Sequence, residues 1–292
     1  MKQLGLIFTG VFLSIFLLVS CNDDENSPQG TMGRINVHLT DSPYPIDLIK
    51  SAFVTIDKVE IRQHLESDQG ENEDSFIVIS EANIEIDLLK LTNGITEQIA
   101  SVDLEAGTYN QIRLHVVDAT IVLNDGTEFD LKVPSGESSG LKIKFDPEIQ
   151  ITEGQTSDVL LDFDVSRSFV VKGNIGSKII GFNFKPVVRG AFLELAGRVE
   201  GNVADTLGIP LENAMVKLWI PAEESTNIVE TEDETFEVSS FTSADGKFKL
   251  IGIPSGKYSL SCEIEGYIGD TINNITVTSG QSTSINFKLK EE

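Results

Sequence analysis

Short runs in which apolar and polar residues alternate cover most of the chain after residue 33. Alternation with a period of two is typical of β-strands that bury one face. The runs before residue 196 are rich in valine, isoleucine and phenylalanine, and they fall at 35–40, 52–61, 76–80, 109–117, 128–133, 141–145, 158–165, 178–184 and 187–195. Turn residues separate them, as in Asn124-Asp125-Gly126. Residues 84–91 fit either a strand or a helical turn.

The pattern restarts near Ala196-Gly197 with seven further runs, at 197–203, 214–220, 235–242, 247–253, 257–265, 271–278 and 283–289. Seven short alternating strands with regular turns predict a β-sandwich. No long amphipathic helix interrupts the strands, which argues against a βαβ architecture. We therefore predict an all-β protein with two β-sandwich-type domains, at 33–194 and 195–292.

The first 21 residues have a different pattern. Lys2 gives a positive start, and residues 4–19 are apolar apart from Thr9 and Ser14. This stretch is shorter than the roughly 20 residues of a spanning helix, and with small residues at its end it predicts a secretory signal rather than an uncleaved anchor. The sequence LVSC at 18–21 resembles the lipobox of bacterial lipoproteins. That resemblance implies that Cys21 is lipidated and becomes the first residue of the mature protein.

Residues 22–32 are polar and acidic at their start, and they predict a flexible tether. Their opening NDDEN resembles the acidic export signal of some Gram-negative lipoproteins. It implies a protein anchored in the outer membrane by lipid and facing the cell exterior. Multiple acyl chains anchor a protein stably, because each buried methylene contributes about 0.8 kcal/mol.

The charge narrows the choice of partners, and the cysteine content bears on the role of Cys262. The formal net charge is −24, which repels phosphate backbones, so we expect no nucleic acid partner. There are two cysteines, and lipidation of Cys21 leaves Cys262 alone. In the run 257–265, Cys262 alternates with polar residues on the apolar face, which predicts a small buried hydrophobe.

The second half resembles the carboxypeptidase regulatory-like, or transthyretin-like, β-sandwich. The segments that carry the resemblance are GRV at 197–199 with Gly201, PLENA at 210–214 with Val216, TSADGKF at 242–248, IPSGKY at 253–258 and GY at 266–267. The resemblance implies a non-catalytic accessory or adhesive module. Because this group is placed with starch-binding-like sandwiches, it also implies carbohydrate as a ligand class.

The first half resembles an uncharacterised domain family of bacterial lipoproteins. The matching segments are LTDSP at 39–43, VTIDKV at 54–59, AGTYNQIR at 106–113, LDFDV at 161–165 and KPVVR at 185–189. The family has no assigned activity, so the resemblance implies an architecture and a location but no reaction.

Few residues suggest catalysis or a metal. The sequence GESSG at 136–140 fits the serine-hydrolase pattern, but it precedes a strand instead of opening a helix, which predicts a polar loop. His38, His64 and His115 have no metal-ligand spacing, and His115 falls on a polar strand face that we expect to be solvated. We expect the same of Asp162 and Asp164. The acidic stretches 68–74 and 230–234 lack the spaced ligands of a calcium loop. We predict no enzyme activity, no cofactor and no metal.

Trp219 is the only tryptophan, and it shares the polar face of its run with Lys217 while Val216 and Leu218 face the other way. A tryptophan in this position either stacks on a sugar ring or covers an edge of the sandwich. Thr206 and Thr271 lie in short Asp-Thr-aliphatic sequences that fit a bacterial O-glycosylation pattern.

Together these features predict a non-enzymatic cell-surface lipoprotein that acts as a binding module. The ligand class that the resemblance favours is carbohydrate, with Trp219 and Lys217 as candidate binding residues. The alternative is a structural or adhesive surface protein, pilus-like or a scaffold, whose partners are other proteins. A long unpaired apolar edge strand would favour that alternative.

Overall fold

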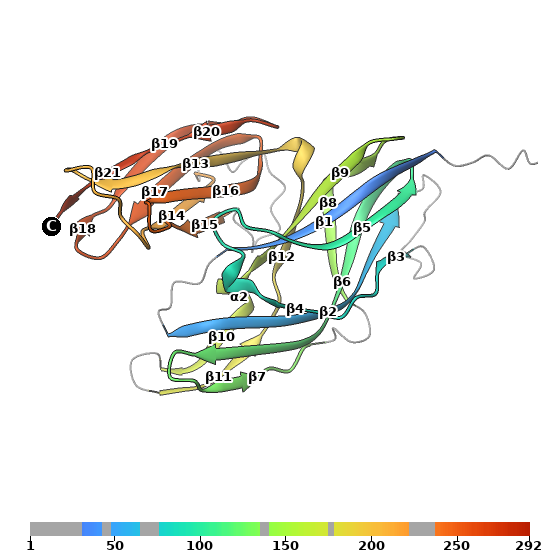
Figure 1. Ribbon diagram of the computed structural model, residues 1–292, viewed down its shortest axis with the longest axis horizontal. Coiled ribbons are helices and arrows are strands. Elements are labelled where there is room, and N and C mark those ends of the chain that lie inside the picture. Colours follow the sequence, from blue (N-terminus) through green and yellow to red (C-terminus); the bar gives the residue numbers. More distant parts are fainter. Residues whose placement is uncertain (1–30, 43–47, 65–75, 135–139, 175–177, 222–236) are drawn as a thin grey trace, which may run out of the picture. The chain divides into compact units, whose positions relative to one another are not determined.

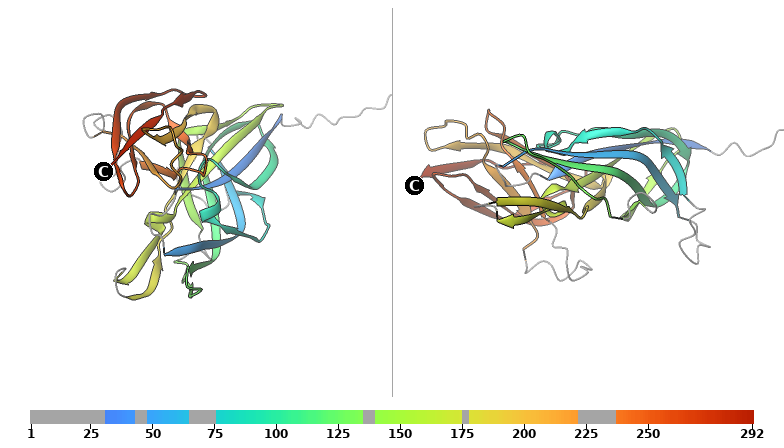
Figure 2. Two further views of the ribbon diagram at one scale, coloured as in Figure 1. Left: turned by 60° about the vertical axis from the view of Figure 1, so that its left-hand side comes forward. Right: turned by 90° about the horizontal axis from the view of Figure 1, so that it is seen from below.

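The computed structural model describes residues 31–42, 48–64, 76–134, 140–174, 178–221 and 237–292 (Figures 1 and 2). Nearly all of its regular structure is strand, which confirms the predicted all-β fold. The buried apolar side chains form two separate cores. One is built from residues between Ile35 and Phe192, and the other from residues between Val199 and Leu289.

In the described ranges of the chain, twelve strands precede residue 193. They are β1 Met32–Ser42, β2 Ile49–Gln63, β3 Phe76–Ser80, β4 Ile84–Asp87, β5 Glu97–Glu105, β6 Gly107–Leu123, β7 Glu128–Asp130, β8 Leu141–Ile151, β9 Thr156–Asp164, β10 Phe169–Asn174, β11 Lys178–Phe184 and β12 Val188–Phe192. One sheet has the order β12-β9-β1-β5, with β1 and β9 parallel. A larger sheet has the order β3-β2-β6-β7, with β4 also paired to β2 and β8 to β6. We call this part of the chain the first domain.

The long strand β6 shows how alternation builds the first core. Ile112, Leu114 and Val116 are fully buried among the apolar side chains of both sheets. Opposite β6, strand β2 contributes Val54 and Ile56 to the same core. Burial of side chains of this size stabilises a fold by about 1.5–3 kcal/mol each, so this core dominates the stability of the domain.

Short elements complete the first domain. The segment 84–91 contains both predicted elements, because strand β4 is followed directly by the 3-10 helix η2 (Leu88–Lys90). The helix α2 (Val165–Ser168) leads from β9 into the two-stranded sheet of β10 and β11. Phe184 of β11 lies 4.9 Å from Phe169 between ring centroids and anchors this hairpin to the core.

After the 3-10 helix η3 (Leu193–Leu195), the described residues form nine strands, in what we call the second domain. They are β13 Ala196–Asp205, β14 Met215–Trp219, β15 Glu237–Phe241, β16 Lys247–Pro254, β17 Gly256–Glu263, β18 Tyr267–Ile268, β19 Asp270–Val277, β20 Ser282–Ser284 and β21 Phe287–Glu291. One sheet has the order β16-β13-β21-β18, with β20 paired to β13, and the other has the order β15-β14-β17-β19. The structure has two described strands more than the seven predicted. The run 283–289 forms two strands, β20 and β21, and β18 has only two residues, too few to show an alternating pattern.

The split between β20 and β21 comes from a close backbone approach at Gly201 of β13. A Cβ atom at this position would lie 1.5 Å from the carbonyl oxygen of Ile285, so glycine is required. Ile285 N–H in turn donates to the carbonyl of Glu200. Cys262 is fully buried in the second core, and burial raises the pKa of its thiol to about 12.

Candidate functional site

Trp219 lies at the end of β14, on the face of its sheet that is opposite to the second core. Val216 and Leu218 of the same strand are fully buried in that core, whereas Trp219 and Lys217 are half-buried. Trp219 pairs with Glu237 of β15 and Ser259 of β17 in the ladder. The indole therefore sits between two polar neighbours on the outer face.

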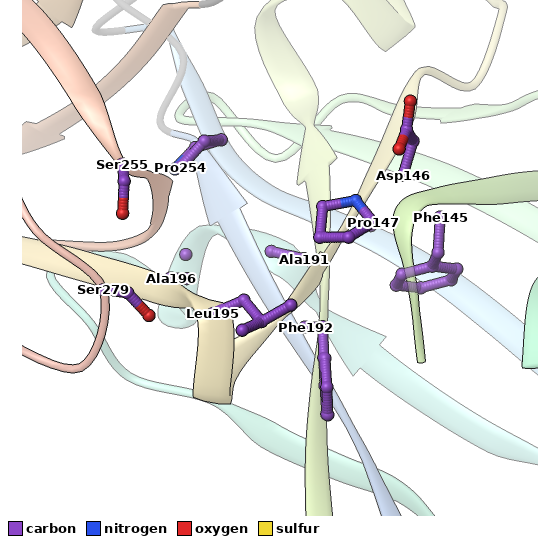
Figure 3. A pocket seen from close by; sticks show the side chains of 12 residues that line it. Phe145, Asp146, Pro147, Ala191, Phe192, Leu195, Ala196, Pro254, Ser255 and Ser279 are labelled. Atoms are coloured by element: carbon purple, nitrogen blue, oxygen red, sulfur yellow. The ribbon is translucent and has the colours of Figure 1, made fainter. Parts of the chain in front are cut away.

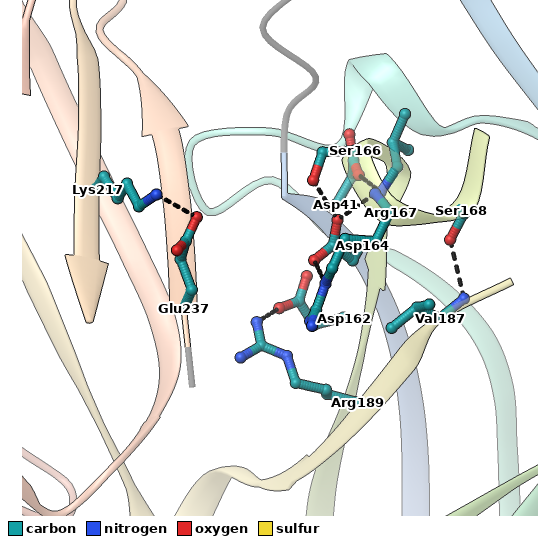
Figure 4. Close-up of polar contacts among 11 residues, drawn as sticks. Asp41, Asp162, Asp164, Ser166, Arg167, Ser168, Val187, Arg189, Lys217 and Glu237 are labelled. Carbon is teal, nitrogen blue, oxygen red and sulfur yellow. Dashed lines mark hydrogen bonds and ion pairs between the residues drawn. The ribbon is translucent and has the colours of Figure 1, made fainter. Parts of the chain in front are cut away.

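Polar side chains on this outer face are held by one another. Lys217 Nζ lies 2.7 Å from Glu237 Oε1 (Figure 4). On the other side of Trp219, the buried Ser259 donates a 2.7 Å hydrogen bond to the amide oxygen of Asn273, which is exposed. An aromatic ring bordered by fixed hydrogen-bonding groups can stack on a sugar ring while its neighbours bond to the hydroxyls. We call Lys217, Trp219, Glu237, Ser259 and Asn273 the Trp219 face.

The other residues singled out from the sequence lie apart from the Trp219 face or outside the described residues. Thr206 follows β13 and Thr271 lies on β19, and both are exposed. Cys21 with its lipobox, and Ser138 of the serine-hydrolase-like sequence, fall outside the described residues. Among the residues that the structure describes, no helix is long and apolar enough to cross a membrane.

Three of the segments by which the first half resembles a lipoprotein domain family lie together around α2. They are 39–43, 161–165 and 185–189. Asp41 of β1 pairs with Phe163 of β9, and its Oδ1 accepts a 3.3 Å hydrogen bond from the backbone N–H of Val165. From the third segment, Val187 N–H donates to the Ser168 hydroxyl at 2.9 Å (Figure 4). Distant parts of the sequence are thus joined through side-chain to backbone bonds, which identifies a structural role for these residues.

The sequence predicted a solvated face for Asp162 and Asp164, but the structure places both carboxylates against polar partners. Asp164 is buried and caps α2, because its Oδ1 accepts from the backbone N–H of Arg167 at 2.9 Å and its Oδ2 pairs with the same residue's guanidinium at 2.7 Å. Asp162 forms an ion pair with Arg189 of β12. The prediction was wrong because Arg189 lies opposite Asp162 in the β9–β12 ladder and because the chain turns into α2 directly after Asp164. These partners account for both carboxylates without acid–base chemistry.

The prediction for His115 was also wrong. This histidine is buried on β6, where its Nε2 lies 2.8 Å from Glu60 Oε2 of β2. Arg113, also buried, reaches the same carboxylate oxygen and stacks on Phe76, with its guanidinium carbon 3.7 Å from the ring centroid. Burial alone would raise the pKa of Glu60, but hydrogen bonds from His115 and Lys58 outweigh it and hold that pKa below its ordinary value.

Asp41 lies in a different electrostatic environment. Burial raises the pKa of its carboxyl well above the ordinary range, and the negative charges of Asp162 and Asp164 raise it further, against the hydrogen bond from Val165. Within the described part of the chain, no three His, Cys, Asp or Glu side chains are grouped so that they could hold a metal ion. The raised pKa is therefore explained by crowded acids around a buried carboxyl.

A groove lies where β8, β9 and β12 meet the turn between β16 and β17, and sequence reasoning missed it. It consists of two adjoining cavities of about 390 and 420 Å³ that share Gly190, Ala191, Gly252 and Pro254. We call it the junction groove. A Cβ atom on Gly190 would lie 2.5 Å from the Phe145 ring, and Gly252 has a φ of +70°. Glycines inside predicted strands were the one sequence signal of this close approach.

Two family comparisons match the two halves. Residues 32–186 match the family described as a domain of unknown function, DUF4382. The chain belongs to that family. Residues 198–290 match the carboxypeptidase regulatory-like domain, which confirms the resemblance inferred for the second half. No curated protein matches the chain.

Similarity to solved structures is weak. The chain is similar to 3-chlorocatechol 1,2-dioxygenase from Rhodococcus opacus 1CP, with 16% identity and a TM-score of 0.27. The match covers 33% of this chain and 60% of the dioxygenase. The minor pilin GBS52 of Streptococcus agalactiae is 11% identical over 88% of this chain and 96% of the pilin, with a TM-score of 0.25. The major pilin subunit BcpA of Bacillus cereus is 10% identical over 89% and 71%, again at 0.25. TM-scores below 0.5 do not establish a shared fold, so these similarities carry no argument about function.

Proposed function

We propose that the protein is a non-enzymatic surface lipoprotein that binds carbohydrate through the Trp219 face. The observation that carries the proposal is the half-buried indole of Trp219 on the outer face of the β15-β14-β17-β19 sheet. Its rigid ring provides the apolar surface that a pyranose face needs. The core residues Val216 and Leu218 lie on the opposite face, so binding and folding depend on different sides of β14.

The polar groups beside the indole supply the second requirement for a sugar site. Lys217 and Glu237 form one pair, and Ser259 and Asn273 form another. The Lys217–Glu237 pair and the exposed Asn273 amide, which the buried Ser259 holds, offer donors and acceptors that are already oriented. This orientation reduces the entropy lost when a hydroxyl-rich ligand binds. The net charge of −24 favours neutral or cationic glycans over acidic ones.

A glycan array with the soluble protein lacking residues 1–21 tests this proposal. We expect binding to a restricted set of neutral glycans, and we expect Trp219→Ala to weaken it. Phe241→Ala, on the same sheet, is the matched control and should retain it. Failure of the wild-type protein to bind any glycan would contradict the proposal.

The cellular location is a separate part of the proposal. We expect Cys21 to carry the lipid that anchors the protein in the outer membrane, facing outward. In cells labelled with a fatty-acid analogue, Cys21→Ala should lose both the label and membrane retention, while Cys262→Ala should keep both. Unchanged labelling of Cys21→Ala would contradict the anchor and leave the glycan proposal standing.

A protein-binding role is the second candidate, and the β10–β11 hairpin favours it. This two-stranded sheet presents Val170 and Ile180, and Ile180 is 66% exposed. An exposed apolar hairpin can pair with a strand from another protein. Specific capture of a surface protein by the wild type, lost in Ile180→Lys, would move the protein to this class.

A further inference from the structure

The junction groove has the dimensions of a small-molecule site. Each of its two cavities falls within the roughly 300–1,000 Å³ range of ligand pockets. Two hydrogen bonds, one of them from a residue that lines the groove, join the segments around it. Ser279 donates to the Glu194 carbonyl at 2.9 Å, and Asn93 donates to the Lys247 carbonyl at 3.3 Å.

One cavity of the groove is mainly apolar. Phe145, Pro147, Phe192 and Leu195 line it, and Figure 3 shows Ala191 between Pro147 on one side and Leu195 on the other. Leu195 is 43% exposed although it faces this cavity. Water against these side chains is released when an apolar group covers them, so this cavity fits a ring or a short hydrocarbon chain.

The adjoining cavity has a different charge from the rest of the molecule. Lys142, Lys144 and Arg189 line it together with one acidic residue, Asp162, which forms an ion pair with Arg189. The formal charge of this lining is positive, whereas the whole chain carries −24. An anionic group that the acidic surface repels elsewhere is therefore favoured at this end of the groove.

We propose that the junction groove binds a small amphipathic molecule, with its apolar ring or chain between Pro147 and Leu195 and its acid group toward Lys142 and Lys144. The apolar cavity and the positively lined cavity adjoin through Gly190, Ala191, Gly252 and Pro254, so one molecule can occupy both. The lining includes none of the Trp219 face, and the site does not depend on glycan binding.

Two fluorescent probes of the same ring size test the site. 8-Anilinonaphthalene-1-sulfonate carries an acid group, and N-phenyl-1-naphthylamine has the same rings without it. We expect both to bind the soluble protein lacking residues 1–21, with the sulfonate binding more tightly at low salt. The advantage of the sulfonate should fall as the salt concentration rises, because ions screen the attraction.

Variants assign each part of the probe to a part of the groove. Leu195→Ser should weaken binding of both probes by about tenfold, because the apolar contact is lost. Leu207→Ser, at a site 85% exposed and outside the groove, is its control and should change neither. Lys142→Gln with Lys144→Gln should weaken only the sulfonate, by about three- to tenfold.

A second double variant controls for the change in net charge. Lys288→Gln with Lys290→Gln removes two exposed lysines of β21 and should leave binding of the sulfonate unchanged. Equal weakening by the two lysine pairs would overturn the placement of the acid group. Absence of binding by both probes, or a Leu195→Ser protein that is folded by circular dichroism and binds both as the wild type does, would overturn the site.

Discussion

The two domains bury different kinds of polar group. In the described part of the first domain, the buried polar residues include four acidic or basic side chains besides His115, those of Asp41, Glu60, Arg113 and Asp164. Among the described residues of the second domain they are serines and threonines, with one aspartate as the exception. That aspartate, Asp205, accepts from the backbone of its own turn.

This difference predicts which kinds of substitution lower the free energy of unfolding of each domain most. A buried hydroxyl needs one partner, and Thr242 has two, the Leu211 carbonyl at 2.6 Å and the Ala214 N–H at 2.8 Å. A buried charge needs an opposite charge, and losing that partner costs far more than losing a hydrogen bond. We therefore expect the stability of the first domain to depend on pH and on single ion-pair partners, and that of the second to depend on its apolar core.

Glu60→Gln should have the largest effect. It leaves the buried Arg113 and His115 without their carboxylate, so the free energy of unfolding of the first domain should fall by about 3 kcal/mol. Denaturant unfolding followed by circular dichroism reports on all strands, whereas fluorescence of the sole tryptophan, Trp219, reports on the second domain. We expect the fluorescence midpoint to stay unchanged. An equal shift of both midpoints would contradict independent domains.

Asp41→Asn should have a smaller effect that depends on pH. Because the pKa of Asp41 is raised in the folded protein, the unfolded chain loses this proton first, and stability falls as pH rises from about 4 toward the folded pKa. The slope for one proton is at most about 1.4 kcal/mol per pH unit. Asparagine can still accept from Val165 N–H and removes this slope, so the variant should gain stability over the wild type as pH rises. A constant difference across this window would contradict a raised pKa.

Glu237→Gln should have the smallest effect, below about 1 kcal/mol, because the Lys217–Glu237 pair is more than a third exposed. This substitution is the surface counterpart of Glu60→Gln. Both remove one carboxylate from an ion pair, and burial is the main difference between them. If Glu237→Gln destabilised the protein as much as Glu60→Gln, the contrast between the domains would be wrong.

The strand pattern predicted most of the fold because alternation depends on local sequence. It placed Val216, Leu218 and Cys262 on the apolar face of their strands. The burial of His115 was not predictable in this way. Its partner Glu60 is 55 residues away, and the register that joins β2 to β6 is not local information. The polar side of β6 looked solvated because alternation does not show what covers a face.

The junction groove was invisible for a related reason. Its lining runs from Lys142 of β8 to Ser279, which follows β19, so residues far apart in the sequence meet in it. The Trp219 face, in contrast, could be predicted in part. Trp219 and Lys217 belong to one strand, while Glu237, Ser259 and Asn273 come from neighbouring strands whose register only the structure gives.

The most direct test of the proposed function compares glycan binding and thermal stability in Trp219→Ala. Calorimetric titration of the variant with a glycan that binds the wild type should show affinity reduced by at least about fivefold, the loss of roughly 1 kcal/mol or more from a stacking aromatic. The melting temperature followed by circular dichroism should remain nearly unchanged, because Val216 and Leu218 on the opposite face form the core. Unfolding of the second domain, or full retention of glycan affinity in a folded variant, would contradict the account.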